Sequence, residues 1–492
     1  MDTGKGNKTF RQSLGLFDST MIVVGSMIGS GIFIVSADIA RTVGSPFYLL
    51  LTWVITGIIT IIAALSYGEL AAMMPKAGGQ YVYLKEAYNS MIGFLYGWTF
   101  FLVIQTGTIA AVAVAFAKFT GVLIPSLSEK NILFEIGGFH ISAAQLFAIA
   151  SLIFFTFTNY RGIRNGKIIQ VILTVTKIIV TLGLIIIGLV VASNFNFWSM
   201  NFSNMWHATT TLVDKNNTII SINQISGLAL VAAIGVAMVG SVFSSDAWNN
   251  VTFIAGEIKQ PKRNIPLSLF WGVLTVTVIY VLANIAYLLL LPLNGTPEAG
   301  DVIGRGIQFA TSDRVGVAAA VRIFGDSAAI IMAALIMLST FGCNNGLILA
   351  GARVYYAMAQ DGLFFKKVGT INKFAVPGFA LVIQCIWASF LCLSGKYGDL
   401  LDYVVFAVMI FYILTISGLF ILRKKRPDAE RPYNAFGYPV LPAIYIVFAI
   451  AFCIDLLLYK PNYTWPGMII VLLGIPVFFI MKKYIKPVEL DS

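Results

Sequence analysis

An apolar segment near the amino terminus contains the stretch Gly25-Ser26-Met27-Ile28-Gly29-Ser30-Gly31-Ile32-Phe33. Its glycines weaken a helix at this point, so the segment can break in two. Inside a membrane, a broken helix is tolerated only where it is buried in protein or lines a cavity, and its freed N–H and C=O groups then become ligands. One half-helix would offer N–H groups to a carboxylate and the other would offer carbonyls to an ammonium group, which together suit an amino acid zwitterion. The alternative interpretation is close helix packing, because Gly25 and Gly29 form a small-xxx-small pair.

The composition places this segment in a membrane protein. The chain has 492 residues, of which 58% are hydrophobic and 11% charged, far from the balance of a soluble domain. A crossing needs about 20 apolar residues, so the length allows on the order of a dozen spans. The sequence predicts an all-α integral membrane fold with twelve spans, near 14–41, 47–74, 91–119, 141–159, 167–192, 225–255, 267–292, 326–358, 376–394, 398–422, 438–459 and 464–481.

The basic residues indicate the orientation. With the N-terminus inside, most of the 33 lysine and arginine residues fall in the tails and loops of the cytoplasmic side. We therefore expect a multi-pass protein of the cell membrane with both termini cytoplasmic, embedded in the lipid bilayer, and no nucleic-acid partner, since no soluble basic domain is present. The predicted divisions are a cytoplasmic tail at 1–13, a ten-helix transport core at 14–422, a cytoplasmic basic loop at 423–437, helices 11 and 12 at 438–481, and a cytoplasmic tail at 482–492.

A second interruption lies in the sixth span. There the run Gly240-Ser-Val-Phe243-Ser244-Ser245-Asp246-Ala247-Trp248-Asn249-Asn250 puts small and polar residues into an apolar helix. Two broken spans five apart are what an inverted five-plus-five repeat predicts, with each half giving one discontinuous helix to a site at the midplane.

The chain resembles the amino acid permeases of the amino acid/polyamine/organocation superfamily, and within it the L-amino-acid-transporter-like branch, over nearly its whole length. Beside the two interrupted spans, the resemblance rests on Tyr67-Gly-Glu69-Leu, Pro75-Lys-Ala-Gly78-Gly79-Gln-Tyr-Val-Tyr83, Gly256-Glu257, Pro261-Lys-Arg263-Asn264-Ile-Pro266, Gly351-Ala-Arg353-Val-Tyr-Tyr and Arg431-Pro-Tyr433.

The resemblance implies a LeuT-like core that holds its substrate between spans one, three, six and eight and works by alternating access. It implies that backbone and hydroxyl groups of the first span bind the carboxylate and the amine. It also implies a gating aromatic and an unwound, pocket-lining stretch in the sixth span. The matching residues are Ile28, Gly29, Ser30 and Gly31 in the first span, and in the sixth Phe243 as the gate, Ser244, Ser245 and Asp246 in the unwound stretch, and Asn249 beside it.

Lys177 is a basic residue deep in the apolar fifth span, at a cost of roughly 3 kcal/mol on insertion scales. Its ammonium could satisfy carbonyls exposed by the broken first span; the alternative is that it snorkels to an interface. In the family, a lysine here occupies the place where sodium-coupled relatives bind their ion, so the resemblance argues against sodium coupling. Ser339 and Thr340 of the eighth span are expected to form the opposite wall of the same region.

Other residues have structural or gating interpretations. Glu69, Glu257 and Arg353 lie near cytoplasmic span ends, where we expect ion pairs that hold the inward gate shut. The four cysteines and two histidines lack metal-ligand spacing, so neither a metal nor a cofactor is expected. The family's disulfide-linked glycoprotein subunit binds through a cysteine between spans three and four, and 121–140 contains none, so this partner is not expected.

The predicted function is sodium-independent exchange of small or medium neutral L-amino acids. Proton-coupled symport is the alternative, since Lys177 can titrate, and a cationic substrate stays possible if Asp246 faces the pocket. An amino-acid-sensing receptor with a transporter fold is the alternative from another class. A channel is disfavoured because most spans lack polar stripes. An enzyme is disfavoured because no convergent catalytic set occurs within the spans.

Overall fold

The computed structural model describes residues 12–136, 139–192, 195–214, 218–325, 327–394 and 397–484. Most of the predicted N-terminal tail (1–11) and of the C-terminal tail (485–492) lies outside these residues.

The described chain is mainly long apolar helices. Ten are long and apolar enough to cross a membrane, and the pair α1 (Leu16–Met27) and α2 (Gly31–Val43), bent by 41° at its break, makes an eleventh candidate span. The others are α3 (Pro46–Met73), α5 (Ser90–Thr99) continuing through the π-helical turn η1 (Phe100–Ile104) into α6 (Gln105–Leu123), α7 (Ala143–Tyr160), α8 (Ile163–Val191), α10 (Gly227–Ser244), α12 (Pro261–Leu290), α15 (Ala328–Gln360), α17 (Tyr397–Lys425), α18 (Val440–Tyr459) and α19 (Pro461–Tyr484).

Shorter elements connect them. The helices are α4 (Gln80–Ala87), α9 (Phe197–Phe202), α11 (Asn250–Phe253), α13 (Val302–Arg305), α14 (Val315–Phe324) and α16 (Gly378–Ser394), and the 3₁₀ turns are η2 (Pro125–Leu127), η4 (Ala255–Glu257), η5 (Thr311–Asp313) and η6 (Lys366–Gly369). Two antiparallel hairpins, β1 (Ile132–Ile136) with β2 (Phe139–Ser142) and β3 (Ala208–Val213) with β4 (Ile219–Ile225), add strands to a fold predicted as all-α. The all-α prediction therefore holds for the spans and not for these connections.

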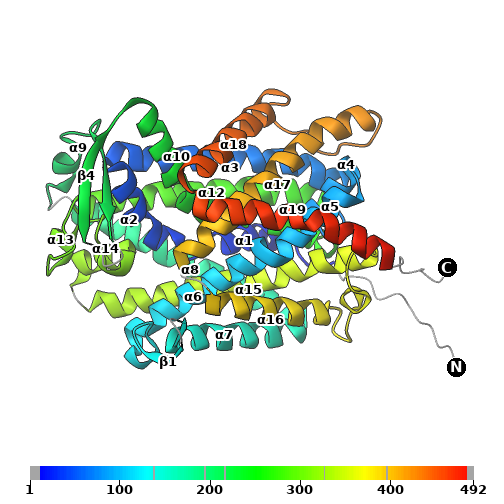
Figure 1. The fold of residues 1–492 in the computed structure, drawn as a ribbon, viewed down its shortest axis with the longest axis horizontal. Coiled ribbons are helices and arrows are strands. Elements are labelled where there is room, and N and C mark those ends of the chain that lie inside the picture. The colour runs from blue at the N-terminus through cyan, green and yellow to red at the C-terminus, as the bar shows by residue number, and fades with distance from the viewer. Residues whose placement is uncertain are drawn as a thin grey trace.

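The long helices lie side by side, and the connections gather at their ends (Figure 1). β4, α9, α13 and α14 cluster at one end of the bundle, whereas α4 and the end of α19 lie at the other. On the outer surface, apolar side chains such as Ile179, Ile186 and Val190 of α8 are 64%, 58% and 68% exposed. Apolar faces of this extent on helices of this length suit lipid rather than water.

The break between α1 and α2 forms where the sequence predicts it. α1 ends at Met27, Ile28 has an extended backbone, and α2 begins at Gly31. Ser26, Ile28 and Ser30 are all buried, so the broken segment lies inside the bundle and not against lipid.

Candidate functional site

Lys177 of α8 reaches the carboxyl end of α1. Its ammonium Nζ donates to the carbonyl oxygens of Gly25 and Ile28, both at 2.7 Å, and to that of Ser339 at 3.3 Å. The side chain is buried, which rules out snorkelling to an interface. A buried ammonium must have acceptors, and the last carbonyls of a helix carry partial negative charge and lack partners within the helix.

Other side chains occupy the remaining carbonyls of this helix end. The Ser339 hydroxyl lies 3.2 Å from the Ile28 oxygen and 3.3 Å from the Gly29 oxygen. The Cys343 thiol donates to the Ser26 oxygen at 3.0 Å. Together with the contacts of Lys177 and of Tyr280, these bonds engage the carbonyls from Gly25 to Gly29.

Tyr280 of α12 joins the two interrupted spans. Its hydroxyl lies 2.9 Å from the carbonyl oxygen of Met27 in α1 and 3.0 Å from that of Ser244, the last residue of α10. The two breaks also touch directly, because a Cβ atom built on Gly31 would lie 2.7 Å from Cβ and 3.2 Å from Cα of Ser244. Only glycine therefore fits at position 31 with α10 in this place.

The amino end of α2 carries partial positive charge, whereas the carboxyl end of α1 carries partial negative charge. The first N–H groups of a helix have no acceptor within the helix and carry partial positive charge. They begin at Gly31, next to the Ser244 end of α10. Since the α1 carbonyls are engaged by protein groups, the N–H end of α2 is the part of the break suited to an anionic group such as a carboxylate.

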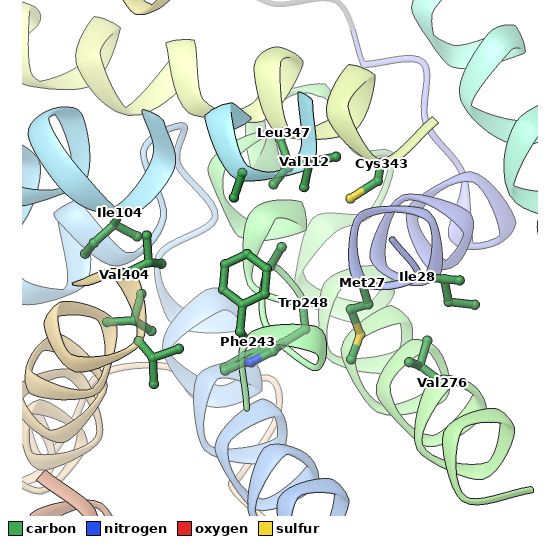
Figure 2. Packing of buried hydrophobic residues seen from close by; sticks show 14 of the residues in the cluster. Met27, Ile28, Ile104, Val112, Phe243, Trp248, Val276, Cys343, Leu347 and Val404 are labelled. Atoms are coloured by element: carbon green, nitrogen blue, oxygen red, sulfur yellow. The ribbon is translucent and has the colours of Figure 1, made fainter. Parts of the chain in front are cut away.

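The sixth span is interrupted where the sequence predicts it. α10 ends at Ser244, and the helix restarts as the single turn α11 at Asn250. Between them Ala247 has a positive φ of 64°, which L-residues other than glycine rarely adopt. Residues in such strained conformations cluster at functional sites. Figure 2 shows Phe243, near the end of α10, and Trp248, within the interruption, with the Phe243 ring pointing toward Val112 and Leu347.

Asp246 and Asn249 bond to residues of other elements and not to the α1 break. The Tyr412 hydroxyl donates to Asp246 Oδ1 at 2.5 Å, and the Asn249 amide donates to Gln80 Oε1 at 3.0 Å. All four residues line a cavity of about 10 Å³, room for about one water molecule. Asp246 and Ser245 also line a second cavity of about 20 Å³. The site therefore has two faces, one at the break and one beside Tyr412.

The two predicted residues of the eighth span, Ser339 and Thr340, have different partners. Ser339 contacts the break, whereas the Thr340 hydroxyl bonds to the carbonyls of Ile336 and Met337 of its own helix. The Ser244 hydroxyl likewise bonds to Gly240 of its own helix. Of the two residues predicted to form the opposite wall, Ser339 is the one whose hydroxyl bonds to the break.

Comparison with known proteins identifies the family. A family model described as amino acid permease matches residues 14–479, nearly the whole chain. The chain belongs to the amino acid permease family. The predicted resemblance is thereby confirmed, and the chain is a multi-pass membrane protein of a transporter family, not an enzyme.

The permease also has individual relatives. Large neutral amino acids transporter small subunit 2 of Mus musculus is 30% identical over 480 residues, covering 97% of this chain and 82% of that protein. The b(0,+)-type amino acid transporter 1 of Mus musculus is 27% identical over 483 residues, covering 97% and 89%. The serine/threonine exchanger SteT of Bacillus subtilis (strain 168) is 27% identical over 476 residues, covering 96% and 97%.

Glu69, Glu257 and Arg353 of the permease all take part in ion pairs. Arg353 Nε lies 3.1 Å from Glu257 Oε1 with both side chains buried. Arg423 binds both carboxylate oxygens of Glu69, at 2.9 and 2.6 Å. The predicted ion pairing of these residues is confirmed, and the gating role stays a prediction.

Tyr280 and Cys343 of the permease lie at the break, although the sequence does not single them out. A tyrosine in an apolar span must place its hydroxyl on a partner, which is a usable signal, but the sequence holds 20 tyrosines. Cys343 gave the weaker signal of a cysteine in an apolar run. Tyr412, the partner of Asp246, was missed for the same reason as Tyr280.

Proposed function

We propose that this permease exchanges small or medium neutral L-amino acids across the cell membrane, without sodium, by alternating access. The names of the relatives support the substrate class and the mode, since one is a large neutral amino acids transporter and another a serine/threonine exchanger. Proton-coupled symport has less support, because no relative cited above is named for it.

The observation that carries the proposal is the position of Lys177. In transporters with broken helices, exposed carbonyls and half-helix carboxyl ends are the groups that coordinate a coupling sodium ion. Here the Gly25 and Ile28 oxygens already hold the Lys177 ammonium at 2.7 Å. The protein thus supplies this positive charge itself, and a sodium ion would have to displace it.

The substrate would bind at the amino end of α2. In this proposal the N–H groups near Gly31 hold its carboxylate, backbone and hydroxyl groups of Ile28, Gly29 and Ser30 complete the site, and Phe243 closes over it. Because the Gly25–Gly29 carbonyls are engaged, and the Ser244 carbonyl is held by Tyr280, we infer that the substrate amine binds carbonyls of the interrupted stretch after Ser244, near Ser245.

The surroundings favour a small, neutral side chain. Asp246 accepts a hydrogen bond from Tyr412, so its carboxylate is already engaged. Asn249 is engaged with Gln80. A cationic side chain would have to compete with the Tyr412 hydroxyl, whereas a neutral one would leave this pair intact.

We also propose how many spans the permease has and how they are related to one another. α16 would be the twelfth span beside the eleven candidates, and the interrupted first and sixth spans would be equivalent members of an inverted five-plus-five repeat. Both termini would be cytoplasmic, which puts the Glu257–Arg353 pair at the inward gate. A disulfide-linked glycoprotein subunit is not proposed, because 121–140 contains no cysteine.

Uptake into proteoliposomes tests this function. Labelled L-alanine, L-serine, L-leucine and L-arginine are offered to vesicles with and without internal unlabelled amino acid, in sodium or choline buffer, and with or without a pH gradient. The proposal predicts uptake that needs internal neutral amino acid and is equal in sodium and choline. Accumulation in empty vesicles driven by the pH gradient would indicate proton symport, and binding without flux would indicate a receptor; either would contradict exchange.

A further inference from the structure

A groove lies on the outside of the helix bundle, apart from the site described above. It has a volume of about 910 Å³, within the range of small-molecule sites. Its walls are α3, the first turns of α12, residues 432–436 and the start of α18 at Leu441.

The floor of the groove is apolar and faces outward. α3 contributes Ile58, Ile61 and Leu65, spaced by three and four residues so that they share one helix face. From Ile58 to Leu65 the stripe runs about 10 Å along the helix. Ile58 is 52% exposed and Phe436 is 70% exposed. Because α3 and α12 are candidate spans, an exposed apolar surface on them suits acyl chains rather than water.

The groove has a defined polar end. Glycine contacts fix the direction of α3 against α12: a Cβ on Gly68 would lie 3.3 Å from Pro266, and one on Gly57 would lie 3.1 Å from the Thr277 hydroxyl. The helices are therefore antiparallel, and the groove runs from the first turn of α12 toward the middle of the spans. Lys262 and Arg263 stand at that first turn, both lining the groove and both exposed.

The wall opposite the helices is anchored. The Ala435 N–H donates to Glu69 Oε2 at 2.7 Å, and Arg431 Nε lies 3.4 Å from Glu69 Oε1. A Cβ on Gly68 would lie 2.9 Å from the ring of Tyr433, so this segment packs directly on α3. These contacts hold the wall of the groove in a fixed position against α3.

We propose that this groove binds an anionic phospholipid, with an acyl chain along Ile58, Ile61 and Leu65 and the phosphate at Lys262 and Arg263. The charge pattern selects this occupant. Two cations at the end of an exposed apolar groove match a molecule with an anionic head and an apolar tail, and basic residues at the end of a span attract anionic headgroups. A second copy of the chain would bring its own two cations to the same end if it docked symmetrically, and like charges would repel.

Glu430 forms an ion pair with Lys262 beside the groove. Its carboxylate Oε2 lies 2.8 Å from Lys262 Nζ, with both side chains well exposed. An exposed pair of this kind contributes little and is readily exchanged. A phosphate would therefore compete with Glu430 for Lys262, while Arg263 is the main cation for the headgroup.

Native mass spectrometry of the purified full-length protein tests the site. The delipidated protein is titrated with phosphatidylglycerol or phosphatidylcholine of the same acyl chains, and bound lipid is counted. We expect tighter binding of phosphatidylglycerol. Arg263→Gln should weaken it about five-fold, the effect of one basic residue near an anionic headgroup. Glu430→Gln should strengthen it, because Lys262 then loses its competing partner.

A matched control removes charge elsewhere. Lys366 and Lys367 are exposed lysines on η6 and do not line the groove, so Lys366→Gln/Lys367→Gln should leave phosphatidylglycerol binding unchanged. A second variant, Leu267→Trp, fills the groove without changing charge and should lower binding of the lipid. Gel filtration confirms that each variant is folded.

Equal binding of the two lipids by the wild type would overturn the proposal. So would loss of binding in the Lys366/Lys367 control to the same extent as in Arg263→Gln, or dimers that form at the groove in place of lipid. If the charge variants do not fold, wild-type selectivity decides alone: it should fall as salt is raised from about 0.1 to 1 M, and salt-independent retention would contradict the role of Lys262 and Arg263.

Discussion

The Lys177 ammonium lies 2.7 Å from the carbonyl oxygen of Ile28, so a charge on the fifth span stands at the break of the first. The same nitrogen binds Gly25 and Ser339, which ties α1, α8 and α15 together at this point. The positive charge at this break therefore belongs to a side chain of the protein and not to a bound ion.

Lys177→Met should abolish exchange. The methionine fills similar space but leaves the Gly25 and Ile28 carbonyls without their donor, and each hydrogen bond to a charged group contributes about 1.5–3 kcal/mol. The measurements are exchange in proteoliposomes and the thermal unfolding temperature. The control is Lys366→Met on exposed η6, which should change neither. Normal exchange by Lys177→Met would refute the role of this residue.

Gly31→Ala should block transport, whereas Gly29→Ala should be tolerated. A Cβ at position 31 overlaps Ser244, but one at position 29 would lie at an ordinary 3.5 Å from the Cys343 sulfur. Exchange activity and expression are measured for both variants. Gly31→Ala/Ser244→Gly should recover part of the activity, since it removes the Ser244 side chain while its Cα still lies 3.2 Å away. Equal activity of the two single variants would contradict contact between the breaks.

Tyr280→Phe should slow exchange and lower stability by about 1 kcal/mol, because the hydroxyl that contacts both Met27 and Ser244 is lost. Tyr287, on the same helix and equally buried, has a hydroxyl with no hydrogen-bond partner in the described part of the chain. Tyr287→Phe should therefore be neutral or slightly stabilising. Initial exchange rates and thermal unfolding measure the difference, and equal losses in both variants would rule out a specific role for Tyr280.

Arg353→Met should destabilise the protein by about 3–5 kcal/mol, since it leaves Glu257 buried without its cation. Arg353→Met/Glu257→Met should recover part of that loss, because neither charge then remains. Arg426→Met, at the exposed pair with Glu86, should cost at most about 1 kcal/mol. Thermal unfolding of the three variants tests this order. An Arg353→Met loss no larger than that of Arg426→Met would contradict the importance of the buried pair.

Some of the site was predictable because its signals are local. Three glycines between Gly25 and Gly31 weaken a helix whatever surrounds them, and a lysine inside an apolar helix must find acceptors. The interruption after Ser244 was predictable for a similar reason, since small and polar residues replace apolar ones there. The ion pairing of Glu257 and Arg353 followed from charges placed at span ends.

Other features depend on contacts between distant parts of the chain. Tyr280 bonds to Met27 and Ser244, and nothing near Tyr280 in the sequence indicates these partners. The direction of Asp246 toward Tyr412 likewise depends on how α17 packs. The strand β3 could have been predicted from local sequence, because 208–213 contains three threonines and a valine, which are β-branched and favour strands.

Counterflow tests the central claim of amino acid exchange most directly. Proteoliposomes containing the full-length protein are loaded with labelled L-serine and diluted into choline buffer with or without external L-alanine. The account predicts that the label leaves quickly only when external L-alanine is present, with one alanine entering for each serine that leaves and no change when sodium replaces choline. Efflux that is equally fast without external amino acid, or that requires sodium, would contradict it.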